Sequence, residues 1–182
     1  AIAWFTLKNV GKGAARFDFS KLESLNAHYI QNLSVTRAVD IMSTGLSQNL
    51  GRPISSHEER RLTLGASGLL SRAKTTSDLI KSGKFYVAKR PIPLDKKARK
   101  ILETSATEIL PKITAALQDL HEWETDQIET QMRELADRHG LKLGSVAQPL
   151  RAALTGTTVS PSIFEVMKAL GRAESLARLS DV

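Results

Sequence analysis

Hydrophobic residues recur along this chain at the three- and four-residue spacing of amphipathic helices, and no segment alternates cleanly with a period of two. The pattern predicts an all-α fold. Asp18 and Ser34 are suited to cap the first two helices, and Gly51 with Pro53 would end the second. The first helix is expected to direct inward Leu22, Leu25, Tyr29 and Leu33.

A third helix is predicted to start at Ser55 or Ser56. Its buried side would carry Leu62, Ala66, Leu69 and Leu70. The basic, proline-bearing segment 89–93 is typical of a connector. We therefore expect a helical bundle or cage of two small subdomains, residues 34–91 and 92–182, preceded by a junction segment, residues 1–33.

The second half of the chain continues the helical pattern. The buried sides of its next helices would carry Leu94, Ala98, Ile101, Leu102, Ile109, Ile113, Ala116, Leu117 and Leu120. Pro111 would mark a kink or a new start. An acidic helix is predicted from about Glu122 to Arg138, with Gly140 as its stop. It would bury Ile128, Met132 and Leu135.

Residues 140–172 are the most informative segment and predict two short helices joined by a polar turn. On a helical wheel, Gln148 and Arg151 lie opposite the apolar residues. The apolar side consists of Leu143, Val146, Leu150, Ala153 and Leu154. An amide and a guanidinium that point outward together are suited to the edges of nucleotide bases. Pro149 predicts a kink or a restart, which would leave Gln148 beside free backbone donors.

The second helix of this segment is predicted to open at Ser160 and Pro161, with the serine as cap and the proline at the first position. Its core stripe would consist of Ile163, Val166, Met167 and Leu170. Phe164 lies at the edge of that stripe. A helical hairpin whose Phe164 and proline are merely packed explains the same pattern, so the pattern alone does not decide the function.

Four residues of the third helix, Arg61, Gly65, Gly68 and Arg72, share one narrow strip at helical spacing. Glycine inside a helix costs roughly 1 kcal/mol relative to alanine. Two glycines on one strip therefore indicate that something approaches closely. A nucleic acid held between two arginines fits this pattern, and so does a tightly packed neighbouring helix.

The charge of the chain favours a polyanionic partner. Its 182 residues include 26 Lys plus Arg and 19 Asp plus Glu, a net charge of +7, and residues 1–103 hold 18 of the basic and 8 of the acidic residues. Such a field attracts nucleic acid, although anionic membranes or acidic proteins would also respond to it. The basic run Lys96, Lys97, Arg99 and Lys100 is either a solvated helix face or a non-specific phosphate contact.

Other chemistries have little support in the residues. The absence of cysteine excludes disulfides and thiolate metal sites and suits a reducing cytoplasm, and the four histidines are dispersed, so we expect no metal site. No apolar run approaches the roughly 20 residues of a membrane span. Trp4, Phe5 and Trp123 are expected in the core. The carboxylates of residues 122–126 suit a helix dipole better than catalysis.

Residues 142–171 resemble the C-terminal anticodon-binding region of bacterial glutamyl-tRNA synthetases, whose signature runs KLGxxAQPLRxALTGxxxSPxxFEVxxxLG. Residues 15–30 resemble ARFDxxKLxxLNxxYI, the segment that follows the catalytic half in the same family. Because the two segments lie at opposite ends, the resemblance covers essentially the whole chain. It implies the all-α anticodon-binding fold of this family.

The resemblance also implies roles for single residues. Arg72, in LLSRAKT, matches the arginine that some of these synthetases place on the third anticodon base, where a guanidinium pairs with cytosine and crowds out guanine. Gln148 would contact the first base and Arg151 the second. The base pockets would be lined by Ser160, Pro161, Ile163 and Phe164, and Phe164 could stack on a base. Arg61 and Lys74 would contact the phosphate backbone.

The family's nucleotide-binding signatures, His-Ile-Gly-His and Lys-Met-Ser-Lys-Ser or variants, are absent from this sequence. We therefore expect no catalytic, cofactor-binding or metal site here. The expectation is the anticodon-binding part of a cytoplasmic, monomeric glutamate–tRNA ligase that reads tRNA(Glu), while the catalytic half of the same synthetase uses ATP and Mg²⁺. Alone the chain would not charge tRNA. A free-standing RNA-binding module and a helical protein-interaction module are the alternatives.

Overall fold

The computed structural model describes residue 6 and residues 18–105 and 108–182. Its described part is built of α-helices without a strand, which confirms the all-α prediction. The helices are α1 (Phe19–Gln31), α2 (Val35–Leu50), α3 (Ser56–Leu70), α4 (Thr76–Val87), α5 (Lys96–Ser105), α6 (Leu110–Gln118), α7 (Thr125–Arg138), α8 (Leu143–Thr155), α9 (Ile163–Leu170) and α10 (Arg172–Leu179).

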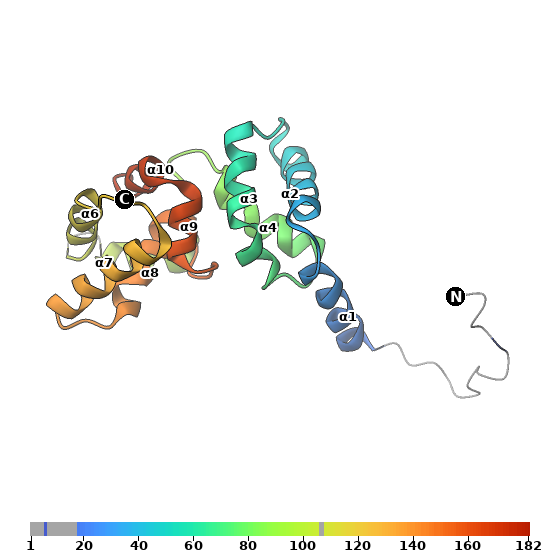
Figure 1. Cartoon of the computed structure of the whole chain (residues 1–182), viewed down its shortest axis with the longest axis horizontal. Coiled ribbons are helices and arrows are strands. Elements are labelled where there is room, and N and C mark those ends of the chain that lie inside the picture. The colour runs from blue at the N-terminus through green and yellow to red at the C-terminus, as the bar shows by residue number, and fades with distance from the viewer. Residues whose placement is uncertain (1–5, 7–17, 106–107) are drawn as a thin grey trace.

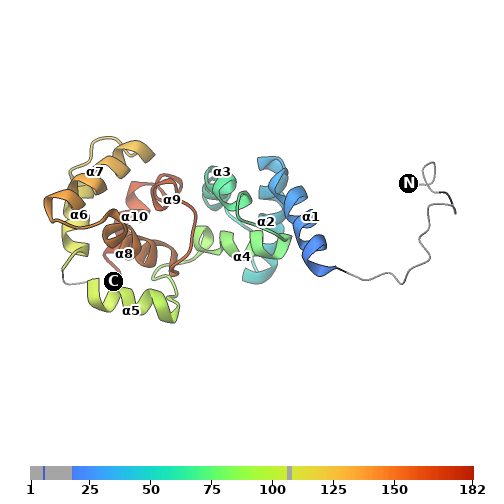
Figure 2. The same ribbon diagram turned by 90° about the horizontal axis from the view of Figure 1, so that it is seen from below.

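The helices pack as two groups that share one interface (Figure 1). In the first group α2, α3 and α4 pack against one another, and the second group consists of α5 to α10. The interface forms where α3 lies against α9 and α4 touches α8. Figure 2 shows that α1 projects from the end of the first group that is remote from the second group.

Local capping determines several helix boundaries. Asp18, Ser34 and Ser55 each accept a hydrogen bond from the backbone N–H three residues later, at 3.1, 3.2 and 3.3 Å. These bonds satisfy donors that have no partner inside the helix. The three predicted caps are confirmed. Pro111 lies in the first turn of α6, where a proline interrupts no hydrogen bond, so it marks a new start instead of a kink.

The predicted core stripes of α3, α6 and α7 are buried. The buried positions include Leu62, Ala66, Leu69, Leu70, Ile113, Leu117, Ile128, Met132 and Leu135. Trp123 is half-buried against this core, and its indole N–H donates to the carbonyl oxygen of Met167 at 2.9 Å. Trp4, Phe5 and the start of the ARFD motif, residues 15–17, lie outside the described residues.

The apolar face of α1 differs from the prediction. Leu22, Leu25 and Tyr29 are 49%, 53% and 66% exposed, and Ile30 is the one fully buried residue of the helix. No other described helix packs along α1. The inward orientation predicted for these three residues is therefore wrong. A hydrophobic stripe favours burial of a helix face, but burial also needs another element to cover that face, and no described helix does so here. Leu33 does pack against the core, as predicted.

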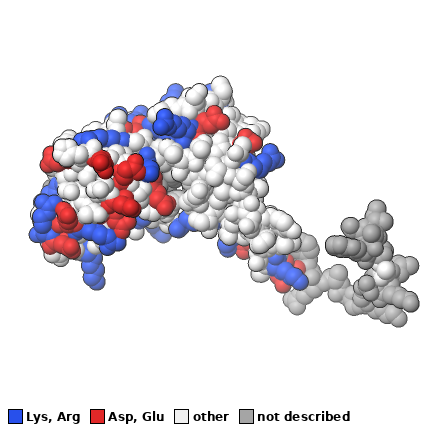
Figure 3. All heavy atoms as spheres, viewed as in Figure 1, with Lys and Arg blue, Asp and Glu red and all other residues white. Residues whose placement is uncertain are grey.

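The surface carries both signs of charge. Seen as in Figure 1, basic and acidic side chains alternate over the second group, while the visible face of α2 to α4 carries few charges (Figure 3). The basic excess of residues 1–103 is therefore not concentrated on this face. No described helix is both long and apolar enough to cross a membrane.

Candidate nucleic-acid interface

A cleft of about 450 Å³ lies between α4 and the segment that joins α8 to α9. Its floor is largely apolar, and its lining includes three cations, Arg72, Lys81 and Lys84, but no carboxylate among the described residues. The remaining lining residues are Leu69, Ser82, Phe85, Ala88, Ile92, Pro93, Thr155, Thr157, Val159, Ser160 and Pro161. An apolar floor with an uncompensated positive rim suits a base attached to a phosphate.

The turn after α8 is fixed against the linker between the two groups. Gly156 has φ +73°, and its carbonyl accepts a hydrogen bond from the backbone N–H of Asp95 at 2.9 Å. A Cβ at this position would collide with the carbonyl oxygen of Pro93. Only glycine meets both conditions without strain. The close approach brings Thr155 and Thr157 into the same cleft wall as Pro93.

Arg151 lies on α8 and forms a hydrogen bond with Ser160, a residue of the cleft wall. It is half-buried, and its Nε donates to Ser160 Oγ at 3.0 Å, while the Ser160 hydroxyl donates to the Pro161 carbonyl at 2.9 Å. Burial, and then the nearby charge of Arg72, lowers the pKa of the Arg151 guanidinium. The charge of Arg72 therefore acts on Arg151, although the two residues come from different helix groups.

Arg72 was predicted on the third helix, but it lies in the turn that follows this helix. α3 ends at Leu70, and the N–H of Arg72 donates to the Leu69 carbonyl at 3.3 Å, closing the turn that leads to α4. The side chain is exposed at the cleft. A position just beyond a helix end gives a long side chain more reach than a position within a packed helix face.

Gln148 is exposed one helical turn before Arg151, on the same helix. The predicted interruption at Pro149 is not a restart, because α8 runs without a break from Leu143 to Thr155. The proline ring removes one backbone donor, the partner that the Ser145 carbonyl would otherwise have. Gln148 therefore does not lie at a helix start, and its amide side chain is what it offers to a ligand.

The hairpin's second helix starts later than predicted. α9 begins at Ile163, with Ser162 at the N-cap position, and Ser160 and Pro161 belong to the non-helical segment that lines the cleft. The side chain of Val159, before them, is 69% exposed beside the cleft and had not been identified from the sequence.

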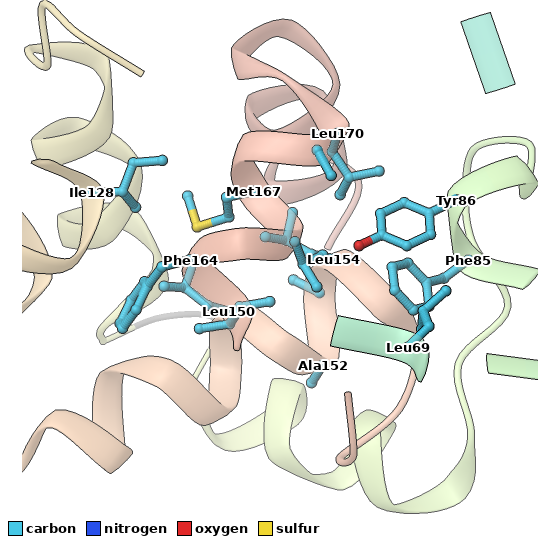
Figure 4. Packing of buried hydrophobic residues seen from close by; sticks show 14 of the residues in the cluster. Leu69, Phe85, Tyr86, Ile128, Leu150, Ala152, Leu154, Phe164, Met167 and Leu170 are labelled. Atoms are coloured by element: carbon cyan, nitrogen blue, oxygen red, sulfur yellow. The ribbon is translucent and has the colours of Figure 1, made fainter. Parts of the chain in front are cut away.

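Ile163 and Phe164 are only 1% and 6% exposed. Figure 4 shows Phe164 among the buried side chains, on the side of α9 that faces Leu150 and Ile128. The prediction that Phe164 stacks on a base is therefore wrong, because a ring enclosed in the core offers no free face to a base. Both side chains belong to the core and neither lines the cleft, so the pocket-lining role predicted for them is wrong.

The glycine strip of α3 faces protein. A Cβ on Gly65 would overlap the ring of Tyr86, and one on Gly68 would lie 2.9 Å from Pro161 Cβ. Arg61 is buried, and its Nη2 pairs with Glu174 Oε2 at 2.9 Å. The packed-helix alternative is the correct one, and the phosphate contact predicted for Arg61 is wrong because this cation is enclosed and neutralised.

The other predicted backbone contacts are exposed. Lys74 lies in the turn that also holds Arg72, and its Nζ is 3.3 Å from Oε1 of Glu23 on α1. Three cations of the basic run of α5 line a shallow hollow together with Leu94 and Glu103, and these cations are Lys96, Arg99 and Lys100. The four exposed cations of this run are Lys96, Lys97, Arg99 and Lys100. Their role stays a prediction.

Lys81 and Lys84 are cleft residues that the sequence analysis did not single out. They are separated by three positions, so they share one face of α4. This spacing was the available signal, but it is equally typical of a solvated helix. Among the described residues, no group of histidine, cysteine, aspartate and glutamate is arranged to hold a metal ion.

Comparison with known proteins agrees with this geometry. The chain is 45% identical over 182 residues to glutamate–tRNA ligase 2 of Paramagnetospirillum magneticum, which covers all of this chain and 38% of the relative. It is 40% identical over 185 residues to glutamate–tRNA ligase 1 of Brucella melitensis, which covers 99% of this chain and 39% of the relative. The chain thus spans about two-fifths of the length of these curated relatives.

Solved structures give the same result. The crystal structure of a glutamate tRNA ligase from Elizabethkingia meningosepticum, in complex with its amino acid, matches 97% of this chain and 34% of its own, with a TM-score of 0.76 and 25% identity. Glutamate-tRNA synthetase from Elizabethkingia anophelis matches with a TM-score of 0.72. Residues 27–182 match the family described as the anticodon binding domain. The chain therefore belongs to the anticodon binding domain family.

Proposed function

We propose that this chain reads the anticodon of glutamate tRNA as the anticodon-binding part of a glutamate–tRNA ligase. The observation that carries the proposal is an apolar cleft between two helix groups, with Arg72 in its lining, Arg151 hydrogen-bonded to its lining residue Ser160, and no carboxylate among the described lining residues. A guanidinium with free donors can pair with the acceptor atoms of a base. The two relatives named above, which are 45% and 40% identical to this chain and longer than it, are glutamate–tRNA ligases.

The three bases would be divided between the two groups. Gln148 and Arg151, one turn apart on α8, would contact the first and second anticodon bases, and Arg72 would contact the third. Arg72 would favour cytosine over guanine, because the purine brings a different donor pattern into the same space. Lys81 and Lys84 would neutralise the phosphates of the nucleotides whose bases enter the cleft.

The chemistry would take place elsewhere in the parent protein. This part would select the tRNA and orient it, so its binding energy contributes to positioning. ATP and Mg²⁺ would be used by the catalytic half, outside this chain. The isolated chain is expected to bind tRNA without charging it.

The test measures binding of the chain to a glutamate tRNA transcript and to a transcript with only the third anticodon base changed to guanine. We expect a preference of about 5- to 150-fold for the cognate transcript, the range for one paired base contact. Arg72→Gln should abolish most of this preference, and higher salt should weaken both affinities. Fluorescence anisotropy with labelled transcripts provides the measurement.

Arg151→Ala supplies a second arm, with an expected loss of about 1–3 kcal/mol on the cognate transcript. The matched control is Arg133→Gln, which removes an exposed arginine paired with Glu129 on α7, away from the cleft. Equal binding of both transcripts by the unmodified chain would refute the proposal and favour a module that binds RNA or protein without anticodon preference.

A further inference from the structure

We propose that Glu174 is a specificity-determining positioning residue, which holds the Arg72 wall of the cleft and the Arg151 wall at one fixed separation. The inference rests on the proposed function, since it concerns how the same cleft distinguishes bases. Glu174 itself lies on α10 and does not line the cleft. It acts through two buried arginines, one in each helix group.

The carboxylate of Glu174 is divided between these arginines. Its Oε2 lies 2.9 Å from Nη2 of Arg61, on α3 of the first group, and its Oε1 accepts from Nε of Arg178 at 2.8 Å, on α10 of the second. Arg178 is fully buried, and the exposed fraction of the Arg61 residue is 7%. One carboxylate therefore joins the two groups.

Each arginine continues to one wall of the cleft. Nη1 of Arg178 donates to the Leu154 carbonyl at 2.6 Å, in the last turn of α8 and one turn after Arg151. Nη1 of Arg61 donates to the Tyr86 carbonyl at 3.5 Å, next to Phe85 in the cleft floor. The path from one wall to the other therefore passes through Glu174.

The cluster has an excess of positive charge. Two guanidinium groups share one carboxylate, and Nε of Arg61 and Nη2 of Arg178 are buried without a hydrogen-bond partner among the described residues. Burial raises the pKa of Glu174, but hydrogen bonds and charge from Arg178 and Arg61 outweigh this and lower the pKa below its ordinary value. Loss of the carboxylate would leave two like charges enclosed together, and they would repel.

A second contact would keep the groups attached when Glu174 is neutralised. Arg90, in the linker after α4, forms a two-pronged ion pair with Asp181, with both donor–acceptor distances 2.8 Å. The apolar contact of α3 with α9 also remains. Neutralising Glu174 should therefore let the distance between the two cleft walls vary more, while the two helix groups stay attached. Base discrimination is sensitive to such changes, because misplacement by about 1 Å is enough to lose a positioned contact.

The first experiment needs no RNA. The chain has no cysteine, so spin labels can be placed uniquely on the exposed serines by Ser77→Cys in α4 and Ser145→Cys in α8. We expect Glu174→Gln to broaden the distribution of distances between the labels and to move its mean outward. Glu129→Gln, which removes an exposed carboxylate paired with Arg133 within one helix, should leave the distribution unchanged.

The second experiment repeats the binding comparison with the cognate and guanine transcripts. Glu174→Gln should lower the ratio of the two affinities by roughly 2- to 30-fold, the range for substitutions that alter coupling between sites. Affinity for an unrelated single-stranded RNA should change little, because no cleft cation is removed. A merely structural residue would lower both affinities together.

The outcomes are distinct. If the unmodified chain shows no preference between transcripts, the proposed function fails, and with it the specificity role of Glu174. If a folded Glu174→Gln keeps either the distance distribution or the affinity ratio of the unmodified chain, the positioning role alone is overturned. Should this variant not fold, Arg61→Met replaces it, because it cuts the same path while leaving the pair of Glu174 with Arg178 intact; the same two losses are expected.

Discussion

Gly65→Ala provides a sharp test of how α3 is packed. The added Cβ would lie 2.5 Å from Cε2 of Tyr86 and still closer to two other atoms of the phenol. Tyr86 is 1% exposed and stacks in a tilted arrangement on Phe85, with ring centroids 4.2 Å apart. The ring therefore has little space into which it can move, and the helices must separate instead.

The size of the effect follows from two opposing contributions. Alanine in place of an interior helical glycine stabilises by roughly 1 kcal/mol. Restoring an ordinary contact distance of about 3.5–4.0 Å requires a shift of at least about 1–1.5 Å. A shift of this size places the cost in the upper half of the usual overpacking range, at about 2–3 kcal/mol. We expect a net destabilisation of about 1–2 kcal/mol, which lowers Tm by about 2–8 °C for a chain of this size.

The matched control is Gly144→Ala in the first turn of α8, where an added Cβ meets no atom within 4 Å. This variant should gain up to about 1 kcal/mol. Thermal unfolding followed by circular dichroism would compare both variants with the unmodified chain. An unchanged or higher Tm for Gly65→Ala would refute the close packing against Tyr86 and reopen the strip to an RNA ligand.

Three further substitutions test the site and its support. Gly68→Ala places a Cβ 2.9 Å from that of Pro161, so it should displace the cleft wall and weaken RNA binding severalfold in anisotropy assays; unaltered affinity would contradict this. Phe164→Leu should cost about 1–2 kcal/mol in urea unfolding but leave RNA affinity intact, whereas a stacking ring would lose affinity. The hydrogen bond with Arg52 lowers the pKa of Glu58 to about 2, so the stability that this pair contributes should be lost as the pH falls from 4.5 towards 2. Glu58→Gln should therefore make the unfolding free energy less dependent on pH in this range. Parallel curves of unfolding free energy against pH for the variant and the unmodified chain would refute this contribution.

The sequence predicts well those features that depend on near neighbours. The caps at Asp18, Ser34 and Ser55 each need only a side-chain oxygen and a backbone N–H three residues later. The buried stripes of α3 and α7 follow from helical spacing in the same way.

The identity of the partner helix, and of the residues that it contributes, was not predictable. Gly65 and Gly68 indicated a close approach, but only the fold shows that Tyr86 and Pro161 are the groups that approach. The sequence alone does not distinguish Arg61 from an RNA-binding arginine, whereas the fold shows that it pairs with Glu174. In each case the deciding contact joins residues far apart in the chain, and no local pattern specifies which elements meet.

The candidate site shows the same division. The outward position of Gln148 follows from the helical wheel, whereas the placement of Arg72 and Ser160, the partner of Arg151, in one cleft requires both helix groups. Phe164 lies at the margin of its apolar stripe, so its burial depended on whether α7 and α8 would cover that margin. Both helices pack against α9, and the side chain is enclosed.

α1 is attached to the turn that carries Arg72, a residue of the cleft lining. The Asn26 side-chain amide donates to the Lys74 carbonyl at 2.8 Å, so α1 is joined to the turn that carries Arg72. The 13 residues of α1 form a rod of roughly 20 Å at about 1.5 Å per residue. Asn26 lies about 10 Å along the helix from its end at Phe19, so a rotation of about 5° at this turn would move that end by roughly 1 Å. A movement of the Arg72 turn would therefore be passed on to α1 through this hydrogen bond.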